Sequence, residues 1–141
     1  MRGALDIVFG AIVLAASSGA AFACSCARDP TAEGILAAAT AVFTGTVRAV
    51  ETMAPGQMVT TFVVAEPFKG VQRGAIVNVH HPDGSAHSCG VSFAYGRSYT
   101  LAAALERGAL WTSQCSTWMF LPDVGLGGDL IVRMRALRRR Q

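Results

Sequence analysis

Charged side chains are scarce in this 141-residue chain: Asp, Glu, Lys and Arg make up 15% of it, and a single lysine stands among the basic residues. So few charges, in a chain that is 52% hydrophobic, exclude a disordered acidic or basic polymer. No apolar run after residue 24 approaches the ~20 residues needed to cross a bilayer, which excludes a polytopic membrane protein. The chain also lacks internal repeats and low-complexity linkers, so its length predicts a single domain.

Motifs for catalysis are lacking as well. The chain has no Ser-His-Asp spacing, no glycine-rich phosphate loop and no H-x-x-x-H zinc motif, so we expect a binding protein rather than an enzyme, and no cofactor. Residues 24–132 hold 6 basic and 8 acidic side chains, which leaves no basic patch there. We therefore expect no nucleic-acid partner.

What the chain does have begins with an export signal. An apolar core at Ile7–Ala16 is followed by small residues and by Ala21-Phe22-Ala23, the small-x-small pattern that a signal peptidase cleaves. We predict that residues 1–23 are a signal peptide and that the mature protein is exported (secreted, periplasmic or in the cell envelope). Two alternatives stay open: an uncleaved membrane anchor, and a lipoprotein with lipid on Cys24.

All four cysteines follow the predicted cleavage site. An even number of cysteines in a small exported domain predicts two disulfide bonds. Three pairings are open, and a bond between Cys24 and Cys26 is the least favourable because a one-residue spacer strains disulfide geometry. Either other pairing ties the N-terminus to two distant segments, at Cys89 and Cys115. A redox pair at Cys24 and Cys26 is a further alternative, although no neighbouring motif supports a reactive thiolate.

The rest of the mature chain predicts a short helix followed by a small β-barrel. Asp29-Pro30 is typical of a helix start, with Asp29 as the N-cap residue. Alternating apolar residues and turn signals then predict five short strands, which favours a five-stranded barrel of the OB kind. The predicted strands cover residues 41–50, 58–65, 75–81, 98–104 and 109–113.

An arginine-rich tail is predicted over residues 123–141, after a domain at residues 24–122. Five of its last nine residues are arginines. The apolar residues at helical spacing in the tail are Leu130, Ile131, Met134 and Leu137. Such a segment suits weak contact with an anionic envelope surface, although charged tails of this kind are more often simply solvated.

Three histidines lie close to Cys89 and would suit a metal ion. They are His80, His81 and His87. No closed ligand set is apparent, and His80 and His81 point to opposite faces if they continue a strand. We expect surface histidines and no metal.

The aromatic residues Trp111, Trp118 and Phe120 would suit a binding patch. Core packing near Cys115 is the simpler expectation, because large aromatic side chains dominate the cores of small domains.

Several short segments together carry a family resemblance. They are Cys24-Ser25-Cys26 directly after the signal site, residues 41–47 (AVFTGTV), Phe68-Lys69-Gly70, Ser88-Cys89-Gly90 with Phe93, Gly96 and Tyr99, and residues 112–115 (TSQC). In these features the chain resembles the netrin-like (NTR) module of the tissue inhibitors of metalloproteinases, as a bacterial-type, single-domain, TIMP-like member. The match spans about residues 24–115, most of the mature chain.

In that family the first cysteine is bonded to the third and the second to the fourth, so the resemblance implies bonds Cys24–Cys89 and Cys26–Cys115 on an OB-type barrel. It also implies that the amine and carbonyl of Cys24 bind the catalytic zinc of a metalloendopeptidase in place of water, while Ser25 enters its specificity pocket. The amine must be neutral to bind zinc, so inhibition should weaken as the pH falls below its ordinary pKa of about 7.7–8.0.

The alternative to inhibition is a non-inhibitory extracellular or cell-envelope interaction module. A barrel can use the same two bonds purely as staples, because a fold does not by itself imply a function.

Overall fold

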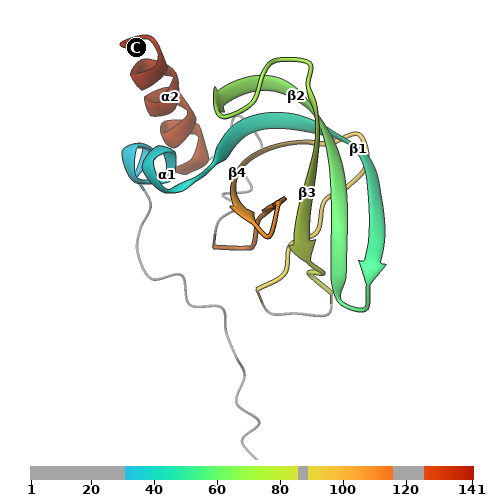
Figure 1. Cartoon of the computed structure of the whole chain (residues 1–141). Coiled ribbons are helices and arrows are strands. Elements are labelled where there is room, and N and C mark those ends of the chain that lie inside the picture. The colour runs from blue at the N-terminus through green and yellow to red at the C-terminus, as the bar shows by residue number, and fades with distance from the viewer. Residues whose placement is uncertain (1–30, 86–88, 116–125) are drawn as a thin grey trace, which may run out of the picture.

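The computed structural model describes residues 31–85, 89–115 and 126–141, without the side chains of residues 126 and 127. The described residues form two helices and five strands (Figure 1). In chain order these are α1 (Ala32–Ala38), β1 (Ala41–Ala54), β2 (Gln57–Lys69), β3 (Ile76–Pro82), β4 (Ser98–Glu106), β5 (Ala109–Trp111) and α2 (Leu126–Arg138). The prediction of a mainly β fold with five strands and a short helix before the first one is confirmed.

The five strands form one closed sheet in the order β1-β2-β3-β5-β4, in which β4 pairs back onto β1. All pairings are antiparallel except that of β3 with β5, which is parallel. β1 pairs with β2 on one side and with β4 on the other, so that Thr44 lies opposite both Glu66 and Thr100. Closure therefore places β4 beside β1, although these two strands are far apart in the sequence.

The inside of the closed sheet is filled by alternate residues of the strands. The largest fully buried side chains there include Phe43, Phe62 and Leu101. The ring of Phe62 makes edge contacts with Phe43 and Phe93, at centroid distances of 5.8 and 5.1 Å, an arrangement that the charge distribution of aromatic rings favours. The period-two pattern that predicts the strands thus also identifies the side chains of the core.

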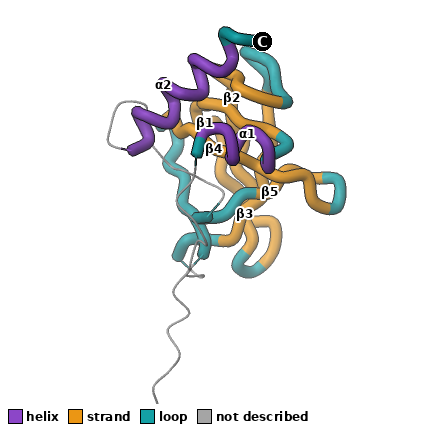
Figure 2. Tube along the Cα trace, turned by 90° about the vertical axis from the view of Figure 1, so that its left-hand side faces the viewer, coloured by secondary structure: helices purple, strands orange, loops and turns teal. Residues whose placement is uncertain are grey.

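The two helices pack against each other and against the outer face of the sheet (Figures 1 and 2). A second apolar cluster lies between them and the strands, and it includes Val42 of β1, Ala102 of β4 and Met134 of α2. Val42 and Phe43 are neighbours in β1, yet they belong to the outer and the inner cluster respectively. The two apolar layers of the molecule therefore share one strand.

α2 overturns the expectation of a solvated C-terminal tail. Ile131 and Met134 are only 1% and 3% exposed, while Leu130 and Leu137 are partly buried beside Met134. The reason is that apolar side chains at helical spacing form one continuous face, and burying that face is more favourable than hydrating it. Neither described helix is long and apolar enough to cross a membrane.

The start of α1 differs from the prediction. The N-cap residue is Thr31, whose hydroxyl accepts a 3.0 Å hydrogen bond from the amide of Gly34, so the assignment of Asp29 as N-cap is wrong. Threonine and aspartate both suit the N-cap position. Thr31 is the N-cap here because it is the last extended residue before the helix begins at Ala32. Asp29 and Pro30 themselves lie outside the described residues.

The strands also differ in length from those predicted. β1 and β2 continue to Ala54 and Lys69, whereas β5 ends early, at Trp111. β2 continues through Pro67, which lies opposite Phe43 at a point where the register of the two strands shifts. A proline cannot donate to a regular ladder, and such an irregularity accommodates it.

Candidate functional site

The predicted zinc-binding residue Cys24 lies outside the described residues, together with Ser25, Cys26 and the predicted signal peptide. His87, Trp118 and Phe120 lie outside them as well. The described part of the candidate site is the frame to which the N-terminus is predicted to be bonded. We call this frame, formed by Cys89 and residues 112–115, the cysteine corner.

One backbone hydrogen bond joins the two halves of the cysteine corner, and a second ties the corner to β3. The amide of Gln114 donates to the carbonyl of Cys89 at 3.1 Å, and the amide of Thr112 donates to the carbonyl of His80 at 2.9 Å. The segment that carries Cys115 is thereby fixed beside the segment that carries Cys89, although the two are distant in the sequence.

Cys89 and Cys115 are both disulfide-bonded, and neither of these two described cysteines is free. The predicted pairing with Cys24 and Cys26 involves residues outside the described ranges, so it stays a prediction. Since Cys24 and Cys26 are separated by one residue, they can bond to two different segments only where those segments lie close together. The cysteine corner meets that requirement.

The turn that leads into Cys89 is held by close backbone contacts. Asp83 and Val91 form an isolated parallel bridge, and the amide of Val91 donates to the carbonyl of Pro82 at 3.1 Å. Gly90 lies directly against this backbone, because a Cβ atom at Gly90 would be 2.2 Å from the carbonyl oxygen of Asp83. The residue after Cys89 therefore has to be a glycine for this packing to form.

His81 anchors the same turn from inside the sheet. Its side chain is fully buried, with Nδ1 3.1 Å from the carbonyl oxygen of Pro82 and Nε2 2.8 Å from the hydroxyl of Thr60. A carbonyl can only accept, so Nδ1 carries the proton and Nε2 accepts from the threonine. Burial lowers the pKa of His81 below its ordinary 6.5, although the carbonyls of Pro82 and Val91 act in the opposite direction.

His80 points away from the core, as its position next to His81 in a strand predicts. Its ring stacks on Trp111 of β5 at a centroid distance of 5.1 Å, whereas the ring of His81 contacts Phe93 of the core at 4.9 Å. The expectation of surface histidines is therefore wrong for His81, which satisfies both nitrogens in the core. The expectation of core packing is wrong for Trp111, which is half-buried beside His80.

The part of the chain that the structure describes contains no group of three or more His, Cys, Asp or Glu side chains placed to hold a metal ion. His80 and His81 diverge, and Cys89 is disulfide-bonded, so the structure does not bring these three residues together as a ligand set.

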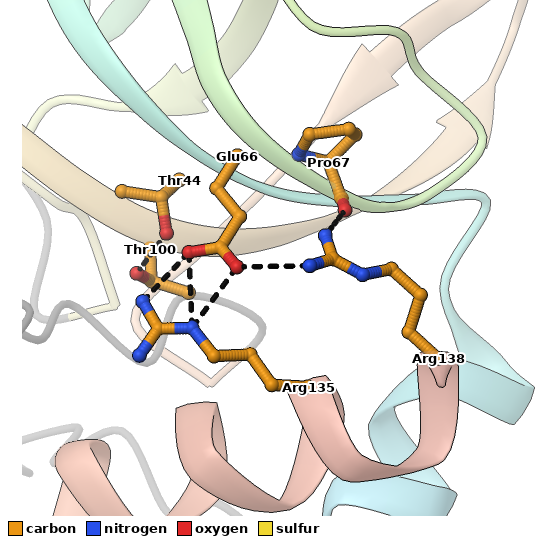
Figure 3. Close-up of polar contacts among 6 residues, drawn as sticks. All are labelled: Thr44, Glu66, Pro67, Thr100, Arg135 and Arg138. Atoms are coloured by element: carbon orange, nitrogen blue, oxygen red, sulfur yellow. Dashed lines mark hydrogen bonds and ion pairs between the residues drawn. The ribbon is translucent and has the colours of Figure 1, made fainter. Parts of the chain in front are cut away.

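A second polar cluster, missed by sequence reasoning, fastens α2 to the sheet (Figure 3). The carboxylate of Glu66, whose side chain is 18% exposed, accepts from Nε of Arg135 at 2.9 and 3.1 Å and from its Nη2 at 2.7 Å. Arg138 donates to the same carboxylate at 3.3 Å and to the carbonyl of Pro67 at 2.7 Å. We call Glu66, Arg135 and Arg138 the arginine clamp.

Electrostatics keep the arginine clamp charged. The hydrogen bonds from Arg135 hold the pKa of Glu66 below its ordinary 4.5, and they outweigh the burial that would raise it. Beside the clamp, the hydroxyls of Thr44 and Thr100 share a buried hydrogen bond of 2.7 Å (Figure 3). A bidentate arginine–carboxylate pair is among the stronger polar contacts in proteins, so we assign the clamp a structural role.

The sequence predicts the two arginines of the clamp as neighbours but does not identify their glutamate partner. Arg135 and Arg138 are three residues apart and thus lie on one face of a helix. No local pattern identifies Glu66 as their partner, because it precedes Arg135 by 69 residues.

No protein-family model matches the chain, and no curated protein matches it significantly.

Proposed function

We propose that the protein is an exported, disulfide-stapled binding domain with an OB-type barrel that inhibits a zinc metalloendopeptidase through the amine and carbonyl of Cys24. It acts by binding and not by catalysis, and it needs no cofactor of its own. Ser25 occupies the specificity pocket of the target. The bonds Cys24–Cys89 and Cys26–Cys115 hold the new N-terminus rigid, which lowers the entropy lost on binding.

One observation carries this proposal. Cys89 and Cys115 are both disulfide-bonded and are held side by side by the hydrogen bond from Gln114 to Cys89. A Cys-x-Cys segment bonded at both points is fixed at two places one residue apart, so its backbone has little remaining freedom. An N-terminus fixed in this way would suit a bidentate ligand for the open coordination position of a catalytic zinc.

The first test is the intact mass of the exported protein before and after reduction. The expected mass is that of residues 24–141 without the hydrogens of the four thiols, and it increases on reduction. A retained leader, lipid on Cys24 or free thiols would contradict the proposal, because each removes the rigid free amine.

The second test is inhibition of a panel of zinc endopeptidases, with serine proteases as the control panel. An alanine inserted between Ala23 and Cys24 moves the amine away from the disulfide. We expect it to weaken inhibition by at least about 30-fold, since losing a central contact costs roughly 2 kcal/mol or more. The matched control carries the same alanine after Gln141 and should inhibit normally.

The second candidate function is a non-inhibitory extracellular or cell-envelope interaction module. It is favoured by a groove lined by Leu36 of α1, Phe68 of β2 and Met134 of α2, because this groove offers a binding surface that does not involve Cys24. Under this alternative the alanine insertion before Cys24 changes no activity of the protein.

A further inference from the structure

We propose that the groove between α1, the end of β2 and α2 binds an anionic amphiphile, a single alkyl chain that carries a phosphate or carboxylate head group. The groove has a volume of about 410 Å³, which lies within the range of small-molecule sites. Leu36, Phe68, Lys69, Met134 and Arg138 line it, and we call it the helix groove. This ligand goes beyond the proposed function, because the helix groove involves neither the N-terminus nor the cysteine corner.

Part of the lining of the helix groove is apolar and suits an alkyl chain. Leu36, Phe68 and Met134 come from three different elements and all belong to the second apolar cluster. Leu36 and Phe68 are only partly buried, so an alkyl chain laid on them would remove them from water, which supplies a favourable free energy. Methionine adapts its shape to a ligand more readily than a branched side chain does.

Two cationic side chains, Lys69 and Arg138, line the helix groove next to its apolar residues. Nζ of Lys69 donates to the carbonyl of Leu36 at 2.6 Å, and the guanidinium of Arg138 lies 5.6 Å from the centre of the Phe68 ring. Both side chains are thus held next to these apolar residues before any ligand arrives. A head group that replaces water there meets positioned donors, which reduces the cost of binding.

The charged side chains that line the helix groove favour an anionic ligand. Glu66 is the carboxylate that compensates Arg138, but it binds Arg135 through three shorter hydrogen bonds and also feels the charge of Arg73. The acceptor observed for Lys69 is a neutral carbonyl. Of the described side chains that line the helix groove, the two charged ones, Lys69 and Arg138, are both cations, and they favour a phosphate or carboxylate ligand.

Titration calorimetry and methyl NMR of the exported protein test this proposal, with decyl phosphate and decanoate as probes below their micelle concentrations. We expect saturable binding of one probe molecule, shifted resonances of Leu36 and Met134, and weaker binding at high salt. The substitution Lys69→Gln should weaken binding by about tenfold, the effect of losing one charged hydrogen bond. Lys69 is exposed, so this variant is expected to fold.

The double variant Lys69→Gln/Arg138→Gln should weaken binding further. Its matched control, Arg107→Gln/Arg133→Gln, removes the same charge from residues that do not line the groove, and it should bind as the natural protein does. Equal weakening in this control would overturn the proposal, since it would indicate general charge attraction. Equal binding of decanol, or of inorganic phosphate, would overturn it as well. So would binding to phosphatidylglycerol vesicles without any binding of the monomeric probes, because the ligand would then be a membrane surface.

Discussion

At the scale of single residues, the imidazole of His81 lies in the core with a hydrogen-bond partner on each nitrogen. Its pKa in the folded protein is lowered by burial, whereas in the unfolded chain it titrates near 6.5. Below pH 6.5 the unfolded chain therefore binds a proton that the folded protein does not. The stability contributed by neutral His81 is complete above pH 6.5 and is lost as the pH falls toward the lowered pKa.

We therefore expect the free energy of unfolding to decrease between pH 7.5 and 5.5, by up to about 1.4 kcal/mol per pH unit for one proton. The variant His81→Gln should show less of this decrease, which urea denaturation at several pH values will measure. The control His80→Gln changes the neighbouring histidine on the outer face and should keep the full decrease. A pH dependence that is the same in all three proteins would show that His81 is not its source.

The prediction for Gly90 concerns packing and not charge, because replacing this glycine adds volume and leaves the charge unchanged. A Cβ at this position would lie 2.2 Å from the carbonyl oxygen of Asp83 and 2.7 Å from the amide nitrogen of Gly84. Gly90→Ala should therefore lower the unfolding free energy by about 1–3 kcal/mol, as overpacking does.

The matched substitution for Gly90→Ala is Gly128→Ala in α2, where the added Cβ meets nothing within 4 Å. Alanine favours a helix more than glycine does, so thermal denaturation should show a gain of up to about 1 kcal/mol. If Gly90→Ala were as stable as Gly128→Ala, the close packing of the turn at Asp83 would be contradicted.

At the scale of elements, the arginine–glutamate pairs that attach α2 differ in burial. Arg135 makes three hydrogen bonds to the largely buried Glu66, whereas Arg133 pairs with Glu33 where both side chains are about half exposed. Arg135→Gln should lower the unfolding free energy at pH 7 by about 1.5–3 kcal/mol, the range for hydrogen bonds to charged groups. Arg133→Gln should have no measurable effect, because exposed pairs contribute little.

Urea denaturation of these two variants checks the comparison. The arginine clamp also has a pH dependence of known sign, because the pKa of Glu66 is lowered in the folded protein. Its contribution is complete above pH 4.5 and is lost as the pH falls further. Equal destabilisation by Arg133→Gln and Arg135→Gln would mean that burial of Glu66 does not decide the strength of the clamp.

The helices and strands were largely predictable from the sequence, but the side-chain contacts that join one element to another were not. Alternation at Phe43, Gly45 and Val47 predicts β1 because a strand places alternate residues on one face. The clamp between Glu66 and Arg135, by contrast, joins residues 69 positions apart, and no local periodicity encodes such a pair. The solvated-tail expectation failed for the same reason: the apolar face of α2 is visible in the sequence, but the surface that covers it is not.

In the candidate site too, local features were predictable from the sequence and long-range contacts were not. The even cysteine count predicts disulfides, and Cys89 and Cys115 are indeed bonded. Their closeness accompanies the hydrogen bond from Gln114 to Cys89 and the pairing of β5 with β3, both of which join segments far apart in the sequence. The expectation that His81 lies at the surface is wrong because a histidine in an alternating strand can face either side. Its hydrogen-bond partner in the core, Thr60, lies on another strand and is not identified by local sequence.

At the scale of the whole molecule, the inner and outer apolar clusters share β1, where Phe43 faces inward and Val42 outward. We therefore expect the sheet and α2 to unfold together. Met134→Ala, a change in the outer cluster alone, should lower the stability by about 2–5 kcal/mol. Hydrogen exchange should report this loss equally at amides of β1 and of α2. Exchange in α2 at a clearly lower free energy than in β1 would contradict this expectation.

Closure of the sheet also determines how the chain must fold. The hairpin of β1 and β2 is local, but the contact between Thr44 and Thr100 joins residues 56 positions apart. Such long-range pairing is slow to form, because the intervening chain loses its freedom before the contact stabilises it. Until β4 arrives, β1 presents an unpaired edge that can pair with another chain. The interval before closure is therefore when this protein is most prone to aggregate, and faster folding, more than higher final stability, would protect it.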